Sequence, residues 1–283
     1  MNIIRAIITP ALLLTLCSSA LAEKNKTDVI EKSYAYRPGQ TVVVDNVYGS
    51  INMKGHDKEV VELKVLRHTT ARNDAQLSQS QKLVVLDVTE DADLIEFYVD
   101  GPFRSRDGHS QRRHYRERDY KVRFDFELRV PRKANILIKT VTEGDISIHG
   151  ILGNFDVAHV NGGIEMTGLK GSGEAYSVNG DVQLDFDANP RADCRFGALN
   201  GEVRMRFRKG LHADFQLKTF NGEFYTDFAL RAGPDKIFNE IKRNGKTVYK
   251  AGHLTRVRAG QGGPLISLDG FNGDMFILNK DAQ

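Results

Sequence analysis

Residues 159–186 read HVNGGIEMTGLKGSGEAYSVNGDVQLDF, and this stretch decides the fold. It holds two copies of an Asn-Gly turn, Asn161-Gly162 and Asn179-Gly180. Further copies are Asn200-Gly201, Asn221-Gly222 and Asn272-Gly273, and Glu143-Gly144 is a degenerate earlier copy. From Gly144 to Gly222 the glycines follow one another at steps of 18, 18, 21 and 21 residues. A near-constant step of this size indicates a stacked repeat architecture.

Each repeat unit carries a short strand after its glycine. In Ile164-Glu165-Met166 and Val182-Gln183-Leu184 apolar and polar residues alternate, so each strand is expected to bury one face and expose the other. A second turn and a second strand then lead to the next Asn-Gly. Glycine suits this turn because we expect a positive φ there, and asparagine tolerates the left-handed region better than most residues.

Two all-β architectures fit this pattern. In a stack, equivalent strands of successive units pair in register, whereas in a meander each Asn-Gly closes an antiparallel hairpin. The same residue types recur at the same register, which favours the stack. We therefore predict a single-domain, β-solenoid-like stack of short strands with Asn-Gly turns, and an antiparallel meander sandwich is the alternative.

The rest of the chain also predicts mainly strands. In the N-terminal part they are expected over residues 41–47, 50–53, 60–66, 83–88, 94–99 and 120–130. Residues 71–82 are polar and predict a loop or one short helix. Toward the C-terminus we expect a short helix over 236–243, a hairpin turn at Asn244-Gly245, and strands 265–268 and 274–278 that cap the stack. We expect the β region 23–124 and the repeat region 125–283 to form one continuous, elongated domain.

Residues 1–22 predict a cleaved secretory signal peptide, with Arg5, an apolar core and the cleavage site Ala20-Leu21-Ala22. The protein is then exported, either periplasmic or secreted. We expect no lipid anchor at Cys17, because Leu16 is larger than the small residue that precedes a lipidated cysteine. The mature chain keeps only Cys194 and therefore forms no intramolecular disulfide. It has no other apolar run long enough to predict a transmembrane segment.

Charge is nearly balanced overall but not locally. The chain has 40 Lys and Arg against 37 Asp and Glu, and removal of Arg5 with the leader leaves 39 − 37 = +2. This balance predicts no general affinity for nucleic acid. Residues 103–124, however, hold eight basic and three acidic residues. We call residues 103–119 the arginine-rich segment and expect it to be a long solvated loop.

The arginine-rich segment is the strongest candidate for a binding site, because guanidinium groups suit phosphate and carboxylate ligands. The candidate contacts are Arg104, Arg106, Arg112, Arg113, Tyr115, Arg116 and Arg118. A loop that is merely solvated is the alternative interpretation.

Several short motifs carry a resemblance to a known family. They are Val130-Pro131 before Lys139-Thr140-Val141-Thr142-Glu143-Gly144, the Val-Asn-Gly and Leu-Asn-Gly units, and Phe271-Asn272-Gly273-Asp274. Asp45-Asn46-Val47-Tyr48-Gly49 resembles the family's first unit. Over most of residues 34–279 the chain resembles the bacterial putative-adhesin family of β-strand-repeat proteins, a family of unknown function. The resemblance implies a β-repeat fold and says little about activity.

Other polar groups offer weaker chemistry. A column of carboxylates follows the repeat glycines and could hold Ca²⁺, although solvated side chains are the favoured interpretation: Asp145, Asp181, Glu202, Glu223 and Asp274. Asp185 and Asp187, near Glu202, resemble an acid–base pair for glycan cleavage, and a surface pattern is again favoured. The histidines lack zinc-site spacing and are expected to be scattered on the surface. We predict no metal and no cofactor.

Taken together, the sequence predicts a non-catalytic, adhesin-like binding or structural module of the cell envelope, not an enzyme. Its loops would recognise a surface or an anionic ligand, and the partner would be an anionic envelope component or an envelope protein. A periplasmic glycan-acting hydrolase that uses strand carboxylates is the alternative. Oligomerisation through an exposed sheet edge is a third interpretation.

Overall fold

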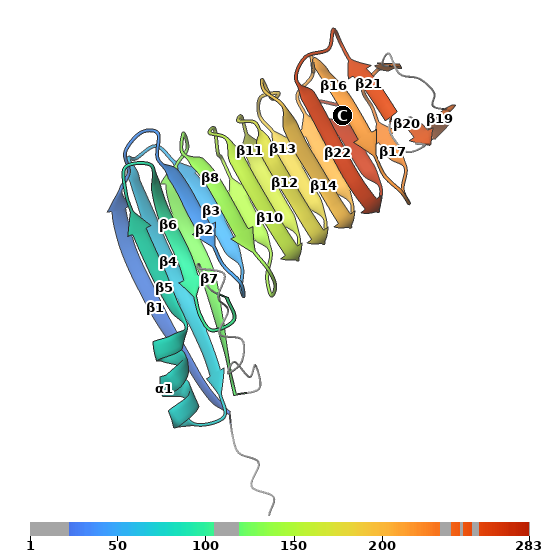
Figure 1. Ribbon diagram of the computed structural model, residues 1–283. Helices are drawn as coiled ribbons and strands as arrows, with labels where there is room; N and C mark the ends of the chain where they lie inside the picture. Colours follow the sequence, from blue (N-terminus) through green and yellow to red (C-terminus); the bar gives the residue numbers. More distant parts are fainter. Residues whose placement is uncertain (1–22, 105–118, 233–238, 244–245, 251–254, 283) are drawn as a thin grey trace, which may run out of the picture.

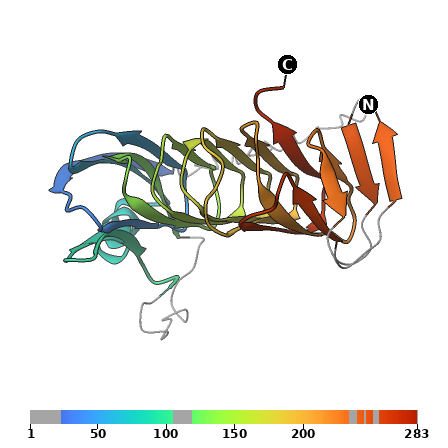
Figure 2. The same ribbon diagram turned by 90° about the horizontal axis from the view of Figure 1, so that it is seen from above.

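Two β-sheets lie face to face along the whole molecule in the computed structural model (Figure 1). The strands run across the long axis, so that the molecule is an elongated stack of strands (Figures 1 and 2). The structure describes residues 23–104, 119–232, 239–243, 246–250 and 255–282, and the predicted signal peptide lies outside them. None of the described helices is long and apolar enough to cross a membrane.

The larger sheet, sheet A, has twelve strands. In spatial order they are β1 (Lys24–Ala35), β4 (Val60–Ala71), β7 (Tyr120–Pro131), β3 (Ile51–His56), β9 (Ile146–His149), β11 (Ile164–Leu169), β13 (Val182–Phe186), β15 (Val203–Phe207), β23 (Met275–Asn279), β17 (Phe224–Thr226), β20 (Lys246–Lys250) and β19 (Asn239–Arg243).

The other sheet, sheet B, has eleven strands. Their spatial order is β18 (Leu230–Ala232), β21 (Thr255–Ala259), β16 (Ala213–Lys218), β22 (Leu265–Asn272), β14 (Cys194–Asn200), β12 (Gly173–Asn179), β10 (Phe155–Asn161), β8 (Asn135–Thr140), β2 (Thr41–Asp45), β6 (Leu94–Asp100) and β5 (Val85–Glu90).

Each repeat unit gives one strand to each sheet, and successive units pair in parallel. In sheet A, Ile164 pairs with both Ile146 and Val182, so equivalent residues of three units lie at one register. Parallel pairing confirms the all-β stack that the Asn-Gly spacing predicted. The meander alternative is wrong for these units, because a meander would reverse the strand direction within each sheet.

The core lies between the two sheets and is built from inward-facing residues of both. Its buried side chains form one contiguous cluster. Aromatic rings also stack within the core. The ring centroids of Phe186 and Phe207 lie 5.0 Å apart, and those of Phe155 and Phe196 lie 6.3 Å apart. Burial of each such ring contributes about 1.5–3 kcal/mol to the stability of the fold.

Close packing of backbones explains the turn glycines better than the φ angle does. A Cβ atom on Gly180 would lie 2.2 Å from the carbonyl oxygen of Gly162, and one on Gly201 would lie 2.3 Å from that of Gly180. We expected a positive φ at every turn glycine. That holds at Gly144 (146°), but φ at Gly162 and Gly222 lies outside the left-handed range. A side chain is excluded by the backbone of Gly273 at Gly222, and by the backbone of Gly144 together with the His159 ring at Gly162.

The turn asparagines form a ladder of hydrogen bonds along the stack. Nδ2 of Asn179 donates to Oδ1 of Asn161 at 2.8 Å, and Nδ2 of Asn200 donates to Oδ1 of Asn179 at 2.8 Å. The ladder continues through Asn272 (2.7 Å) and reaches Asn221 (2.8 Å). A carboxamide carries both donors and an acceptor, so identical residues in register satisfy one another. We refer to these five residues as the asparagine ladder.

The C-terminal strands do not cap the stack, as the sequence suggested, but lie inside it. β22 is paired in parallel with β14 on one side and β16 on the other, and β23 lies likewise between β15 and β17. Antiparallel strands β18 to β21 form that end of the molecule instead. Residues 239–243, expected to be helical, form β19 because β20 offers them an edge to pair with. The predicted Asn244-Gly245 turn lies outside the described residues.

The N-terminal end of sheet A consists of three long strands, β1, β4 and β7, in antiparallel pairing. The polar stretch after β4 forms helix α1 (Asp74–Leu83), which confirms the helix alternative. Its N-cap is Asn73, whose side chain accepts a hydrogen bond from the backbone N–H of Gln76. Nη2 of Arg67 donates to the carbonyl of Ser80 (3.0 Å) and ties the helix to β4.

Two glycine substitutions separate the effects of close packing and of φ. Gly222→Ala would place Cβ 2.1 Å from the carbonyl oxygen of Gly273 at an ordinary φ, and we expect it to cost about 2–3 kcal/mol of unfolding free energy. Gly210→Ala keeps open space around Cβ but has φ +72°, and should cost about 1–2 kcal/mol. Urea unfolding measures both, and a larger cost for Gly210→Ala would contradict the packing explanation.

Candidate functional site

Arg104 is the one predicted ligand contact that the structure describes, and its side chain is held within the protein. Nη1 donates to Oδ1 of Asp45 at 2.6 Å, while Nε and Nη2 donate to the carbonyl oxygens of Val99 (2.7 Å) and Asp45 (2.6 Å). The guanidinium carbon lies 3.9 Å from the ring centroid of Tyr98. Arg104 therefore anchors the start of the arginine-rich segment to β2 and β6. The other predicted contacts lie outside the described residues: Arg106, Arg112, Arg113, Tyr115, Arg116 and Arg118.

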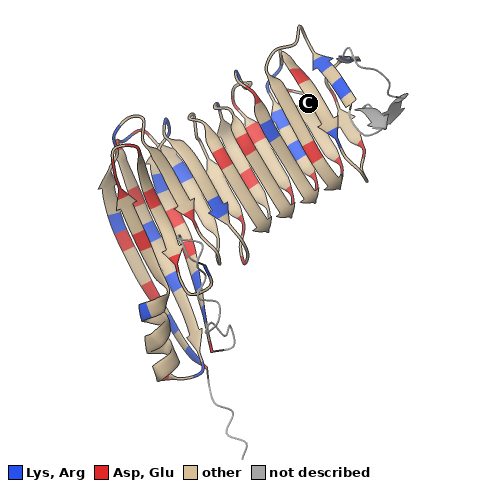
Figure 3. Cartoon of the chain, viewed as in Figure 1, with Lys and Arg blue, Asp and Glu red and all other residues tan. Residues whose placement is uncertain are grey.

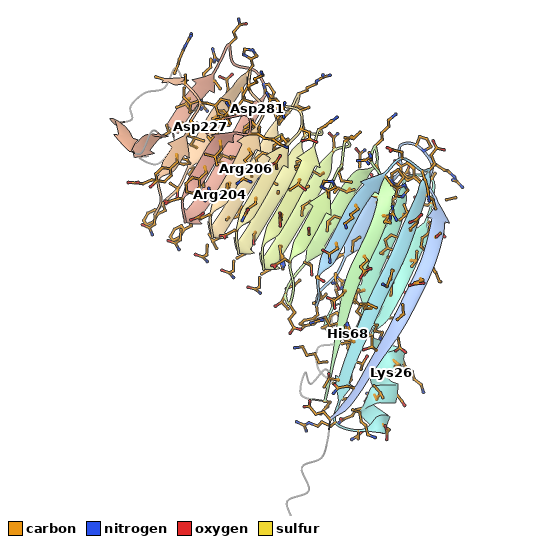
Figure 4. All side chains as sticks on the ribbon, turned by 180° about the vertical axis from the view of Figure 1, so that it is seen from behind. Lys26, His68, Arg204, Arg206, Asp227 and Asp281 are labelled. Carbon is orange, nitrogen blue, oxygen red and sulfur yellow. The ribbon has the colours of Figure 1, made fainter. Side chains whose placement is uncertain are left out.

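A hollow of about 360 Å³ lies on sheet A where the three long strands meet. We call it the basic hollow. It is lined by Asn25, Lys26, Thr27, His68, Thr69, Thr70, Lys121, Arg123 and Glu143. Figure 4 marks His68 and Lys26 on this part of the sheet. The strand pairing explains the cluster, because Thr27 lies opposite His68 on β4, and His68 lies opposite Arg123 on β7.

Hydrogen bonds and ion pairs connect the side chains of the basic hollow. Oγ1 of Thr27 lies 3.0 Å from Nδ1 of His68, and Nε2 of His68 lies 3.3 Å from Oδ2 of Asp125. The same carboxylate binds Nη2 of Arg123 at 2.7 Å and accepts hydrogen bonds from Ser50. Because Asp125 is already shared among these donors, it is poorly placed to activate His68 as a base.

The cations of the basic hollow are paired but accessible. Lys121 binds Glu143 at 2.6 Å with about half of its side chain exposed (54%), and Arg123 is 42% exposed. Exposed ion pairs contribute only about 0–1 kcal/mol, so an incoming anion can compete for these partners. With neighbouring hydroxyl and amide groups, the hollow has the donors that a phosphate, sulfate or carboxylate needs.

The basic hollow and the arginine-rich segment adjoin each other in the chain. The segment ends at Asp119, and β7 begins with Tyr120, so Lys121 and Arg123 follow within four residues. The sequence had placed these two residues in the basic stretch. It gave no sign of Thr27 and His68, because their contact depends on the pairing of β1 with β4, 41 residues apart.

Aspartates of the carboxylate column accept hydrogen bonds from backbone N–H groups of neighbouring units. Oδ1 of Asp145 accepts the backbone N–H of Gly163 (2.7 Å), and Oδ1 of Asp181 accepts that of Glu202 (2.8 Å). Asp274 accepts the N–H of Glu223 in the same way, at 2.9 Å. These carboxylates thus bind across rungs, while Asp145 and Asp181 are also exposed to solvent, as expected. Among the described residues, no three His, Cys, Asp or Glu side chains are grouped so as to hold a metal ion.

Asp185 and Asp187 form an ion-pair cluster with Lys280. Nζ of Lys280 binds Asp185 and lies 2.7 Å from Oδ1 of Asp187. The hydrogen bond from Lys280 lowers the pKa of Asp187 and outweighs the opposing effect of partial burial. A glycan-cleaving acid requires the opposite, a carboxyl group with a raised pKa. Asp187 therefore does not have the pKa that the acid of the hydrolase alternative needs.

Two histidines expected on the surface are buried, His56 (8% exposed) and His159 (2% exposed). Nε2 of His159 lies 2.6 Å from the carbonyl oxygen of Gly144, and Oγ of Ser177 in the next unit donates to that of Gly162 at 2.8 Å. The side chains of His159 and Ser177 face inward because turn carbonyls of the neighbouring unit point at them. His159 is therefore a structural residue of the turn.

Cys194 is buried on β14, and burial raises the pKa of its thiol. The thiol stays protonated and packs as a small hydrophobic group.

Comparisons with known proteins give only remote likenesses. No family model and no curated protein matches the sequence. A solved structure described as a putative cell adhesion protein from Clostridium sporogenes shares 12% identity over 91% of this chain and 100% of its own, with a TM-score of 0.44. A putative adhesin from Bacteroides fragilis shares 12% over 89% and 97%, with a TM-score of 0.39.

A third structure, described as a putative lipid binding protein from Parabacteroides distasonis, shares 11% identity over 89% of this chain and 96% of its own, with a TM-score of 0.23. Two of the three descriptions match the label of the family that the sequence resembles. Identities and TM-scores this low carry no argument about what this protein binds.

We predict that Lys280→Ala raises the pKa of Asp187 toward the usual aspartate range, because it removes the main cause of the depression. In the intact protein the folded-state pKa lies below the unfolded one. The carboxylate therefore stabilises the fold above the unfolded pKa, and this contribution is lost as the pH falls through the folded pKa. NMR titration of the carboxyl carbons measures the shift. Lys170→Ala, which removes only a longer-range charge interaction, is the control, and equal shifts in both variants would contradict the assignment.

Proposed function

We propose that the protein is an exported, non-catalytic binding module of the cell envelope that recognises an anionic partner. The arginine-rich segment and the basic hollow would form the binding surface. The observation that supports this most is their continuity, since β7 carries the chain from the segment into the hollow through Lys121 and Arg123. Export rests on the predicted signal peptide.

The scaffold suits a recognition role because it holds both ends of the arginine-rich segment. Arg104 fixes the start of the segment to Asp45, and Phe103 packs edge-to-face on Tyr48, with ring centroids 5.9 Å apart. At the other end, β7 is hydrogen-bonded to β4 on one side and to β3 on the other. A binding loop held by a rigid sheet loses less conformational entropy when its ligand binds.

The charge pattern favours a partner with several anionic groups. Residues 103–124 carry an excess of 8 − 3 = 5 positive charges, whereas the mature chain carries only +2. Each exposed charge pair contributes about 0.2–1 kcal/mol, so useful affinity requires several pairs at once. Phosphate groups of lipids or lipopolysaccharide and carboxylates of acidic glycans meet this requirement, and guanidinium groups bind either in a bidentate manner.

The test is binding of the mature protein to anionic vesicles, neutral vesicles, lipopolysaccharide, peptidoglycan and acidic glycans. We expect binding to at least one anionic material, weaker at about 500 mM than at about 50 mM salt because screening shortens the range of charge interactions. The variant Arg112→Ser, Arg113→Ser, Arg116→Ser, Arg118→Ser should bind at least about tenfold more weakly, since four pairs of about 0.5 kcal/mol are lost.

A matched control removes the same charge elsewhere. Four exposed arginines outside both the segment and the hollow serve this purpose when each is changed to Ser: Arg37, Arg191, Arg206 and Arg231. This control should bind nearly as well as the unaltered protein. Equal losses of affinity in the two variants would mean that only net charge matters, which would contradict the assigned binding surface. The absence of binding to every anionic material would overturn the proposal. Slow breakdown of a glycan would instead favour the hydrolase.

A further inference from the structure

The order of units along the stack differs from their order in the chain. The unit with β14 and β15 is followed in sequence by the unit with β16 and β17, yet the two units do not touch as neighbours in either sheet. The C-terminal pair, β22 and β23, occupies the position between them. We call this position the insertion slot, bounded by β14 and β16 in sheet B and by β15 and β17 in sheet A. It is filled only by the last strands of the chain.

The insertion slot recognises its occupant by specific side chains as well as by backbone pairing. Asn272 completes the asparagine ladder, with hydrogen bonds to Asn200 (2.7 Å) and Asn221 (2.8 Å). Phe271 stacks on Phe220 with centroids 4.9 Å apart. On the outer face of sheet A, the ring of Phe276 is enclosed on both sides.

Two different contacts enclose that ring. Tyr225 of β17 stacks on Phe276 at 5.0 Å, and the guanidinium carbon of Arg204 on β15 lies 4.0 Å from the ring centroid. Figure 4 marks Arg204 on this face. The walls of the slot are therefore complementary to this strand pair and distinguish it from an arbitrary extended peptide.

The connection that leads into the strand pair is short and rich in glycine. β21 lies on the far side of β16 from β22, and residues 260–264 between them read Gly-Gln-Gly-Gly-Pro. Gly260 and Gly262 have φ of +56° and +81°, which other residues rarely adopt. Such a glycine-rich link lets β22 and β23 leave the slot while β21 stays paired with β16.

The strand pair that fills the slot is also far from it in the sequence. Asn200 follows its ladder neighbour Asn179 by 21 residues, but Asn272 follows Asn200 by 72. While the strands between Asn200 and Asn272 are still unfolded, loop-closure scaling makes closure of this ladder position about sixfold less favourable than closure of an ordinary one. The strand pair of another molecule therefore competes best during folding, before β21 pairs with β16 and holds the chain's own pair beside the slot.

We propose that the insertion slot is an interaction surface for the C-terminal strand pair of a second copy of this chain. Copies then link by exchanging residues 265–279, reciprocally into a closed dimer or one-way into a longer chain. The donated pair makes the same ladder contacts in the partner that it makes within one molecule. This inference does not depend on the proposed ligand.

A single engineered disulfide distinguishes the two arrangements in the full chain. Arg195 on β14 and Ser267 on β22 are register partners, and adjacent strands lie within disulfide reach. In a Cys194→Ala background, Arg195→Cys with Ser267→Cys gives a cross-linked monomer when the pair is inserted in its own molecule. It gives covalent dimers or longer chains when the pair is exchanged. Non-reducing electrophoresis after refolding over a hundredfold range of protein concentration separates these products.

The matched control is Glu174→Cys with Arg195→Cys in the same background, a register pair on β12 and β14 that a short connection closes. We expect the dimer fraction of the Arg195/Ser267 variant to rise at least tenfold across the concentration range, while the control stays monomeric. Circular dichroism checks that both variants are folded. Cross-linked monomer alone at every concentration in the Arg195/Ser267 variant, or equal dimer formation in the control, would overturn the proposal.

Discussion

Parallel, in-register contact between equivalent turns is the constraint on which this structure depends. The carbonyl oxygen of each turn glycine lies where the next turn would place a Cβ atom, as at Gly162 and Gly180. A column that repeats one residue type must therefore consist of residues that tolerate their own kind at strand spacing. Glycine does so by lacking a side chain, asparagine by bonding to itself, and phenylalanine by stacking. Aspartate does so by accepting a backbone N–H from the next rung, as Asp145 and Asp181 do.

Much of the fold could be predicted because the repeat is local in sequence. The spacing of Asn161, Asn179 and Asn200 identified the units, and strict alternation identified β7. Two features of the fold could not be predicted from the sequence because they depend on strands that are far apart in the chain. β1 has no clean alternation and is a strand because β4 pairs along its whole length. The insertion of β22 and β23 is invisible in sequence, because their pattern suits an inner position as well as a terminal one.

The candidate site shows the same division between local and distant information. The arginine-rich segment was evident from its composition, and the structure adds how its ends are held. Thr27 and His68 joined the site only through strand pairing, and no spacing rule links them. Arg104 shows the opposite case. Its residue type suggested ligand contact, but an aspartate and an aromatic ring from neighbouring strands hold it as an anchor. In the charge view of Figure 3, acidic and basic residues are intermixed over the strands that face the viewer.

The asparagine ladder also bears on how this protein ages chemically. Asn-Gly is the dipeptide most prone to deamidation, because the backbone nitrogen of the glycine can attack the side-chain carbonyl and close a succinimide ring. Here those nitrogens are held by the next rung, since Gly162 N donates to the carbonyl of Asn179 and Gly180 N donates to that of Asn200, both at 2.9 Å. The stacking that places a fragile dipeptide at these rungs thus also protects it there, and a molecule with an open rung would lose its asparagines first at that rung.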